Sequence, residues 1–271
     1  MKSGKEISIE KKLLEIVGSF QLSGKALEGL NWMFESDEIQ AAQEYANTVS
    51  IMRLGFNDHG PVHMRTVALN AALMFDLLRK AGIKTSLETD DCGDFEDSLL
   101  SVITASMLHD LGMGVGRQDH ELHSVILASP IIDKLLADVY KDNTRKKVTL
   151  RALTMEGIRG HMGSISVCSL EAGVVQIADG CDMTKGRARI PIALGHSPRV
   201  GHIHQYSANS IEEVLISAGS EKPVRIDVRM SSEVGLFQVE EVLLHKIAGS
   251  TAKPHIELYA QVQGETEKRY L

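Results

Sequence analysis

The doublet His109-Asp110 is the strongest chemical signal in this chain. It closes an apolar run, Leu99–Leu108, and precedes a glycine-rich break. The apolar residues of the run occupy most of the circumference of a helix, which predicts that the helix is buried. A carboxylate and an imidazole at the end of such a helix lose hydration unless something compensates. A divalent metal ion compensates, because it takes imidazole nitrogen and carboxylate oxygen together. A capped helix end with a surface His-Asp pair is the alternative.

Three further polar residues lie in similarly apolar surroundings. His63 precedes by one turn an inward stripe that runs from Val67 to Leu78. His161 follows the apolar positions of another expected helix, and Asp179 is the acidic residue of an otherwise uncharged, mostly apolar stretch. Each of these, taken singly, is more often a partnered core residue than a metal ligand. Together they form an ordered series of His, His-Asp, His and Asp.

This order resembles the HD superfamily of metal-dependent phosphohydrolases, whose signature is a first His, a His-Asp doublet and a later Asp. The resemblance covers roughly residues 58–191. It implies that His63 is the first metal ligand, that His109 and Asp110 are the doublet, and that Asp179 is the final ligand.

HD proteins with two metals add two histidines between the doublet and the final Asp. His120 matches the first added pattern, because Ser124 falls on its small position, and His161 matches the second, as Ile158-Arg-Gly-His161. His123 competes with His120, since positions three apart lie on neighbouring faces of a helix. The metal ligands implied for a binuclear centre are His63, His109, Asp110, His120, His161 and Asp179.

The chain departs from the HD-GYP branch, which cleaves cyclic dinucleotides. It has no Gly-Tyr-Pro triplet, and the segment after His161 reads Met-Gly-Ser-Ile-Ser. Cyclic di-GMP is therefore not the expected substrate. The segments that flank the ligands look like those of a group of stand-alone HD phosphohydrolases common in archaea and some bacteria.

The implied ligand set predicts metal-assisted hydrolysis. Histidines and carboxylates suit Fe or Mn, with Co, Ni or Zn as further options, better than Ca or Mg. Asp110 can bridge two ions through its two oxygens and is the expected catalytic residue, and a hydroxide held between the ions can attack phosphorus. We expect a phosphohydrolase that cleaves a small phosphate ester, either a nucleotide monoester or a cyclic phosphodiester. The alternative is a sensory or regulatory protein that binds a nucleotide without turnover.

Positive side chains near the ligand series are candidates for binding the substrate. Arg117 follows the glycine-rich break after the doublet, and Lys185 and Arg187 follow Asp179. Arginine is apt because its planar guanidinium can pair with two phosphate oxygens. Solvated surface charge is the alternative for each of these residues.

Four other polar residues receive expectations of their own. Asp58 is expected to cap the helix that begins near Pro61, which leaves His59 as a weaker candidate for a proton donor to the leaving oxygen. Glu156 and Glu171 are expected to be ordinary charges on helix surfaces.

Composition narrows the class of partner. The chain of 271 residues is 43% hydrophobic and 24% charged, as is ordinary for a soluble globular protein. A net charge of -7 and an aromatic content of 4% argue against a nucleic-acid polymer as partner. Three cysteines without Cys-x-x-Cys spacing argue against a disulfide scaffold and against a thiolate zinc site. No segment resembles a signal peptide or a membrane span, so we expect no membrane partner and a cytoplasmic location.

Two parts of the chain differ in periodicity. Helical patterns fill residues 9–181, whereas strand-like stretches lie at 211–216, 224–230 and 255–262, with an amphipathic helix at 238–248. We expect a mainly α protein: a helical HD-domain bundle (residues 1–195), a connector at 191–201, and a small α+β domain (residues 196–271) of ββαβ order with a mostly antiparallel sheet. The sequence leaves open whether this sheet pairs two copies as a homodimer or covers the active site.

Overall fold

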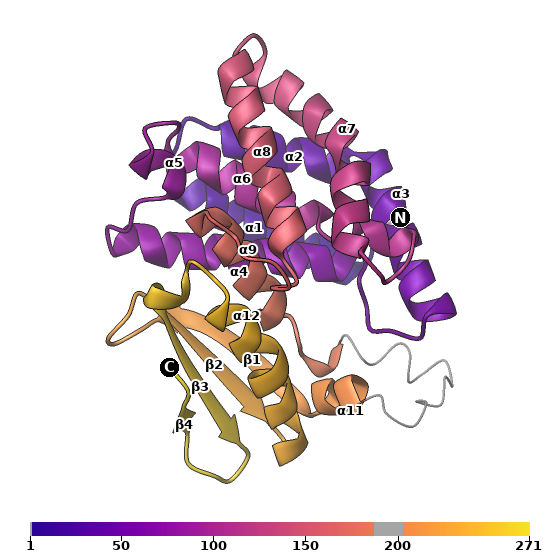
Figure 1. Cartoon of the computed structure of the whole chain (residues 1–271), viewed down its shortest axis with the longest axis vertical. Coiled ribbons are helices and arrows are strands. Elements are labelled where there is room, and N and C mark those ends of the chain that lie inside the picture. The colour runs from indigo at the N-terminus through magenta and orange to yellow at the C-terminus, as the bar shows by residue number, and fades with distance from the viewer. Residues whose placement is uncertain (1, 187–202) are drawn as a thin grey trace.

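The N-terminal part of the chain is a bundle of helices joined by short connections (Figure 1). This computed structural model describes residues 2–186 and 203–271, apart from the side chains of residues 204 and 205. We call residues 2–186 the helical part. Its elements are α1 (Gly4–Ser19), α2 (Lys25–Glu35), α3 (Asp37–Thr48), the π-helical η1 (Val49–Arg53), α4 (Pro61–Lys80), α5 (Ser86–Thr89), α6 (Phe95–Leu108), the 3-10 turn η2 (Leu111–Gly114), α7 (His120–Tyr140), α8 (Thr144–Gly160) and α9 (Leu170–Cys181).

Helix α6 is the centre of the bundle. All of its side chains are buried, and it packs against α2, α4, α8 and α9. The helix begins at a capping box, in which the Asp94 carboxylate accepts from the Asp97 backbone N–H and Asp97 caps in return. The buried helix predicted before His109 is therefore present, and it delivers the doublet to the interior of the protein.

Helix α4 presents its predicted stripe inward. Val67 and Leu78, at the two ends of the stripe, are buried. Pro61 is the first helical residue, where its fixed φ suits a helix and its missing N–H costs nothing. Asp58 is not the helix cap that the sequence predicted, because the N-cap of α4 is Gly60 and no side chain caps the helix. Asp58 instead accepts from the backbone N–H of Gly60 at 2.8 Å and closes the turn just before the helix.

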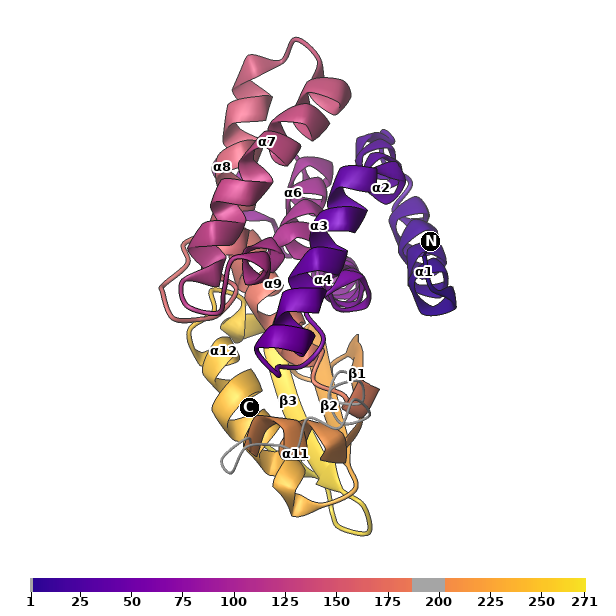
Figure 2. The same ribbon diagram turned by 90° about the vertical axis from the view of Figure 1, so that its right-hand side faces the viewer.

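Residues 203–271, which we call the C-terminal part, form a four-stranded sheet with helices on one face (Figure 2). The elements are α11 (Ile203–Ser210), β1 (Ile211–Ala218), β2 (Val224–Met230), the 3-10 turn η3 (Glu233–Gly235), the π-helical η4 (Gln238–Leu243), α12 (Leu244–Ala248), the 3-10 turn η5 (Lys253–His255), β3 (Ile256–Val262) and β4 (Lys268–Arg269). The predicted strands and helix are confirmed, as is the fold class: a helical bundle followed by a small α+β unit.

The strand order is β1-β2-β3-β4, and the central pairing differs from the simplest expectation. The β1–β2 and β3–β4 pairs are antiparallel, whereas β2 and β3 are parallel. The reason is that η4 and α12 carry the chain back across the sheet before β3, which is a βαβ connection.

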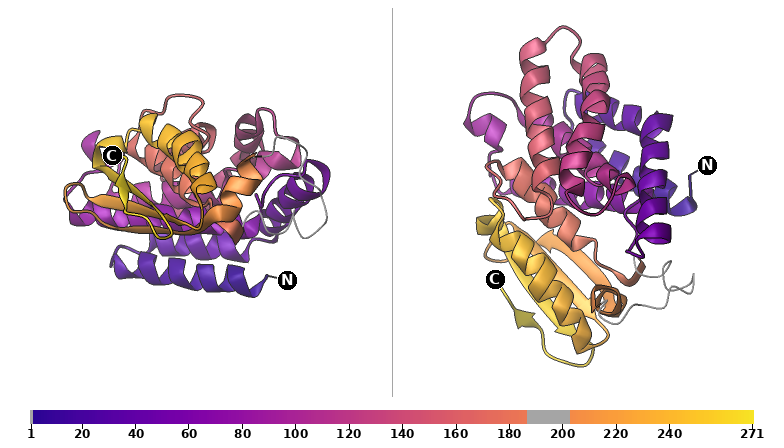
Figure 3. Two further views of the ribbon diagram at one scale, coloured as in Figure 1. Left: turned by 90° about the horizontal axis from the view of Figure 1, so that it is seen from below. Right: turned by 45° about the vertical axis from the view of Figure 1, so that its right-hand side comes forward.

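The C-terminal part packs beneath α4 and α9 (Figures 1 and 3). Helix α9 contacts α12 and η4, while α4 contacts β1 and β2. The expected domain boundary at residues 195–196 and the connector at 191–201 lie outside the described residues. Within the described ranges, no helix is both long and apolar enough to cross a membrane.

Glu171 is not the surface charge that the sequence suggested. Its side chain is buried, accepts from the Ser98 hydroxyl at 2.7 Å, and accepts from the backbone N–H groups of Ser86 and Leu87 at the start of α5. Glu156 is half-buried and accepts from the Ser169 hydroxyl at 2.7 Å. Glu171 therefore ties α9 to α5 and α6, and Glu156 ties α8 to the residue that caps α9. The local pattern of a sequence does not reveal such partners.

Candidate metal centre

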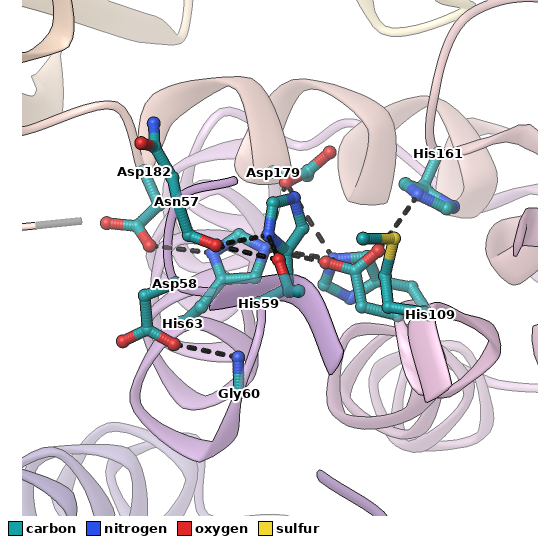
Figure 4. A network of polar contacts seen from close by, with 12 residues as sticks. Asn57, Asp58, His59, Gly60, His63, His109, His161, Asp179 and Asp182 are labelled. Atoms are coloured by element: carbon teal, nitrogen blue, oxygen red, sulfur yellow. Dashed lines mark hydrogen bonds and ion pairs between the residues drawn. The ribbon is translucent and has the colours of Figure 1, made fainter. Parts of the chain in front are cut away.

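The predicted ligand series converges at one place in the interior, where five helices end or begin. Four of its members are labelled in Figure 4: His63, His109, His161 and Asp179. The side chains come from α4, α6, α7, α8 and α9 or from the residues just after them, and all are buried. We call these six residues the candidate metal centre: His63, His109, Asp110, His120, His161 and Asp179. Three overlapping triplets of their donor atoms each lie within 4.8 Å of one another.

The first cluster consists of His63, His109, Asp110 and Asp179. The Nε2 atom of His63 lies 3.2 Å from Asp110 Oδ2 and 3.3 Å from Asp179 Oδ1. The Nε2 atom of His109 lies 3.3 Å from the same Asp110 oxygen and 3.7 Å from the same Asp179 oxygen. Two imidazole nitrogens and two carboxylate oxygens thus face a common point.

The second cluster consists of His120, His161 and the other oxygen of Asp110. The Nε2 atoms of His120 and His161 lie 3.4 Å and 3.5 Å from Asp110 Oδ1. Asp110 therefore offers Oδ2 to the first cluster and Oδ1 to the second. This is the geometry that a carboxylate bridging two cations requires.

Backbone carbonyls fix the tautomer of three of the histidines. The Nδ1–H groups of His109, His120 and His161 point at the carbonyl oxygens of Ser106, Arg117 and Ile158, at 2.8, 3.0 and 2.7 Å. A carbonyl oxygen can only accept, so Nδ1 carries the proton and Nε2 of the neutral ring carries a lone pair. Ser106 and Ile158 belong to the last turns of α6 and α8, where carbonyls lack intrahelical partners.

The fourth histidine is oriented by a carboxylate. His63 Nδ1 donates to Asp182 Oδ2 at 2.7 Å, and its Nε2 faces inward, toward Asp110 and Asp179. Asp182 follows Asp179 by three residues and was not among the predicted site residues. A carboxylate behind a metal-ligating histidine fixes the ring and raises its basicity.

The spacing of the inner histidine nitrogens shows whether a cation fits the candidate metal centre. His63 Nε2 and His109 Nε2 lie 3.1 Å apart, and so do His120 Nε2 and His161 Nε2. Two unprotonated nitrogens at this distance have no hydrogen to share, whereas a divalent transition-metal ion satisfies both. The donor set of the candidate metal centre therefore fits such ions.

The protonation states agree with this reading. Burial lowers the pKa of His161 to about 4, which leaves its ring neutral near pH 7. Burial would raise the pKa of Asp110, but the imidazoles of His109, His59 and His120 around it hold that pKa well below its usual range. Burial opposes ionisation of Asp179 too, yet the Lys246 ammonium keeps its pKa well below the usual range. Neutral imidazoles and ionised carboxylates are the forms that bind metals.

Lys246, like Asp182, was not among the predicted site residues. It comes from α12 of the C-terminal part, is buried, and its Nζ donates to Asp179 Oδ2. A signal existed: Lys246 follows Val239 and Leu243 by seven and three residues, so a lysine occupies the apolar face of the amphipathic helix predicted at 238–248.

A cavity of about 590 Å³ opens onto the centre. Asp110, His161 and Asp179 lie on its floor, and Arg117 lines it from the helical part. Its other wall is built by η4 and α12 of the C-terminal part, including Val242, His245 and Lys246. The C-terminal part thus covers one side of the candidate site, which is one of the two arrangements that the sequence left open.

Arg117 faces this cavity without a carboxylate partner among the described residues. Its guanidinium lies 3.5 Å from His120 Nε2, 4.0 Å from the sulfurs of Met113 and Met162, and 5.8 Å from the centre of the Phe56 ring. None of these partners is a carboxylate. A half-buried cation without a carboxylate beside it in the described part of the chain is suited to receive an anion.

The other predicted residues are placed differently. Lys185 lies on the surface, paired with Glu212, and does not line the cavity. Arg187 lies outside the described residues. His123 lies outside the donor clusters, while His59 lines the cavity with its Nδ1 2.6 Å from the Asn57 carbonyl oxygen.

The difference between His120 and His123 has a packing cause. A Cβ atom at Gly112, in η2, would overlap the His120 carbonyl oxygen and lie 2.6 Å from the Ser124 backbone nitrogen. Because Gly112 has no side chain, η2 packs directly against the first turn of α7, and the Gly112 N–H donates to Ser124 Oγ at 2.8 Å. This contact turns His120 toward the doublet and accounts for the small residue at position 124.

Comparison with known proteins places the chain in a family without assigning an activity. No protein-family model and no solved structure matches it. It is 41% identical over 233 residues to "Uncharacterized protein MJ1020" of Methanocaldococcus jannaschii, an alignment that covers 86% of this chain and 88% of that protein. The chain therefore belongs to the same family as this Methanocaldococcus jannaschii protein.

Proposed function

We propose that the protein is a metal-dependent phosphohydrolase of the HD superfamily that acts on a small phosphate ester. One observation carries the proposal: two clusters of neutral imidazole nitrogens and carboxylate oxygens share Asp110 at the floor of a cavity that also holds Arg117. The order of the six ligands along the chain is that of HD proteins with two metals. The candidate substrates are a nucleotide monoester and a cyclic phosphodiester.

Divalent ions such as Fe or Mn, when bound here, supply a Lewis acid that acidifies water and neutralises charge on phosphoryl oxygens. The chain's own residues prepare the site for this. Asp110 presents one oxygen to each cluster, and the backbone carbonyls of Ser106, Arg117 and Ile158 hold the histidines with their lone pairs inward. These groups are buried and held before any ligand arrives, so little reorganisation is needed during the reaction.

Arg117 is the described residue best placed to bind the phosphoryl group. It lines the same cavity as Asp110 and His161, and it has no competing carboxylate among the described residues. Its planar guanidinium can pair with two phosphoryl oxygens and hold the ester against the centre.

The cavity is consistent with a small substrate. Its volume of about 590 Å³ lies within the range of ordinary small-molecule sites. Apolar side chains of Phe56, Met162, Met183 and Val242 line it beside the polar floor. This mixture suits the organic portion of a phosphate ester better than an extended polyanion.

The test couples metal analysis to a substrate panel. Protein purified without oxygen is analysed for Fe, Mn, Co, Ni and Zn, and is then assayed for phosphate release and ester cleavage on nucleoside monophosphates and cyclic nucleotides. We expect two ions per chain and turnover of at least one ester, both lost in Asp110→Ala. Absence of bound transition metal would overturn the proposal, whereas bound metal with nucleotide binding but no turnover would favour the sensory alternative.

A further inference from the structure

Lys246 joins the C-terminal part to both clusters of the candidate metal centre. Its Nζ donates to Asp179 Oδ2, in the first cluster, and at 2.9 Å to the backbone carbonyl oxygen of His161, in the second. These partners lie 67 and 85 residues away in the chain. The Lys246 backbone is held as well, because its carbonyl oxygen accepts from Gln176 Nε2 at 2.9 Å.

Glycines on α9 make this approach feasible. A Cβ atom at Gly180 would lie 3.1 Å from Lys246 Cδ and from Leu243 Cδ1. Two turns earlier, a Cβ atom at Gly173 would overlap Thr251 Oγ1 and lie 2.7 Å from Ser250 Oγ. Helix α9 thus places Asp179 at the centre and packs its glycine backbone directly against the C-terminal part. This close packing sets the position of Lys246.

The two oxygens of Asp179 have different partners. Oδ1 faces the Nε2 atoms of His63 and His109, at 3.3 and 3.7 Å. Oδ2 is held by the Lys246 ammonium, whose side chain is 7% exposed. The Asp179 carboxylate therefore interacts with the Lys246 ammonium through one oxygen and with the first cluster through the other.

We propose that Lys246 is a positioning residue of the metal centre, which holds Asp179 as a one-oxygen ligand and weakens the hold of the first cluster on its ion by sharing the carboxylate charge. The inference rests on the proposed metal centre. The lysine organises Asp179 before an ion arrives, and it leaves a bound ion more electrophilic because less carboxylate charge reaches it.

Two opposing effects decide what removal of Lys246 does to metal affinity. Loss of a residue that orients a ligand typically weakens metal binding about 10–100-fold. Loss of a whole positive charge on the far side of the same carboxylate strengthens binding, and burial makes this effect large because solvent screens it little. The charge effect dominates, since Asp179 retains the His63 and His109 nitrogens that face its other oxygen.

The test compares Lys246→Met with Lys222→Met in the full chain. Lys222 is the matched control, because it lies in the same C-terminal part and its Nζ donates to a backbone carbonyl, that of Ile256, at 2.8 Å. Metal-free protein is titrated with Co²⁺, and binding is measured by calorimetry and by visible absorption. We expect one Co²⁺ ion to bind at least about tenfold more tightly to Lys246→Met than to the parent, because the repulsion between the lysine ammonium and the ion is removed. Binding to Lys222→Met should be unchanged.

Two further readouts report on the orientation of Asp179 and on the metal-free state. The visible Co²⁺ bands of Lys246→Met should lose intensity, because a released carboxylate can offer both oxygens and raise the coordination number. Metal-free Lys246→Met should unfold about 5–15 °C below the metal-free parent, since an uncompensated buried carboxylate remains. Saturating Co²⁺ should narrow this difference.

Chemical rescue separates charge from packing. Lys246→Ala with added propylammonium should regain the Co²⁺ spectrum and the weaker Co²⁺ binding of the parent, whereas 1-propanol should do neither. Equal or weaker Co²⁺ binding in Lys246→Met, an unchanged spectrum, or equal rescue by the alcohol would overturn the inference while leaving the proposed function standing. A parent protein that binds no Co²⁺ would instead overturn the proposed function itself.

Discussion

Each histidine of the candidate metal centre is held at its outer nitrogen, so that its inner nitrogen faces the other donor atoms of the centre. For His109, His120 and His161 the holding group is the carbonyl of the residue three positions earlier in the chain. Such carbonyls are available because helices α6 and α8 end there and α7 has not yet begun. The same local device therefore sets three ligands, and single substitutions can test them one at a time.

His120→Gln and His123→Gln separate the ligand from its neighbour. We expect His120→Gln to lose one of two bound ions, because the second cluster would keep only His161 and one Asp110 oxygen. His123→Gln should keep both ions, since its side chain lies outside the donor clusters. Elemental analysis after exhaustive dialysis measures this directly. Loss of metal from His123→Gln would contradict the placement of α7.

Arg117→Ala should impair substrate handling and leave the metals in place. Arginine has no lone pair to offer a cation, so the metal content should equal that of the parent. Loss of one charge-assisted pair worth roughly 2–3 kcal/mol lowers kcat/KM by about 10². Arg117→Lys should recover part of this loss, because a lysine keeps the charge without the planar fork. Unchanged kinetics in Arg117→Ala would assign phosphate binding to another residue.

The pKa of His161 predicts acid sensitivity of the metal-free protein. Burial lowers this pKa to about 4, whereas an unfolded histidine titrates near 6.5. Between these values the unfolded chain takes up a proton that the folded protein does not, so the free energy of unfolding falls as pH falls from 6.5 to 4, by at most about 3 kcal/mol. Urea unfolding of metal-free protein across this range measures the effect. His161→Gln should flatten the curve, and an equal slope in both proteins would contradict this assignment.

Among the helices, α9 has two faces with different roles. One face bears Asp179, and the other bears Gly173 and Gly180 against the C-terminal part. Helical glycine is normally unfavourable by about 1 kcal/mol relative to alanine, because it loses more backbone freedom on folding. At Gly173 this disadvantage is outweighed, since any side chain would meet the loop at 250–252.

Gly173→Ala and Gly18→Ala form a matched pair. Both glycines lie in helices, but a Cβ at Gly18 meets nothing within 4 Å. Gly18→Ala should therefore leave stability unchanged or raise it by up to about 1 kcal/mol. Gly173→Ala should destabilise by about 1–3 kcal/mol, because the loop must move to admit the methyl group. Denaturant unfolding of both variants measures the difference, and equal stability would show that the C-terminal part docks less tightly than the structure indicates.

At the scale of the whole molecule, metal binding and folding are linked. The ligands come from five helices, and Lys246 adds the C-terminal part, so an ion that binds the folded centre stabilises most of the chain. Among residues 2–186 and 203–271, this region holds three buried carboxylates (Asp110, Asp179 and Asp182) and one buried ammonium, that of Lys246, so the described side chains leave negative charge for cations to neutralise.

Thermal unfolding with graded Mn²⁺ tests this linkage. An ion present at a thousandfold excess over its Kd stabilises the folded state by about 4 kcal/mol, which raises Tm by roughly 10 °C in a chain of this size. Chelation with EDTA should reverse the shift. Ca²⁺ should have little effect, because it prefers sites made of oxygen ligands alone. A Tm that does not respond to Mn²⁺, Fe²⁺ or Co²⁺ would contradict a metal centre that spans these helices.

The series of His and Asp residues and the change from helix to an α+β unit could both be predicted from the sequence. Both are local patterns: His and Asp residues interrupt apolar segments of period 3.6, and alternating segments follow from residue 211 onward. The strands, the amphipathic helix at 238–248 and the buried helix before His109 could therefore be predicted within a few residues.

The folded structure, and not the local sequence, sets how these residues meet. It divided the two oxygens of Asp110 between two clusters, turned His120 rather than His123 toward them, and left Lys185 on the surface. It also brought Asp182 behind His63 and delivered Lys246 to Asp179 across 67 residues of chain. The physical reason is that these contacts depend on how helix ends and bare glycine surfaces pack against one another, and the local periodicity of a sequence does not encode that packing.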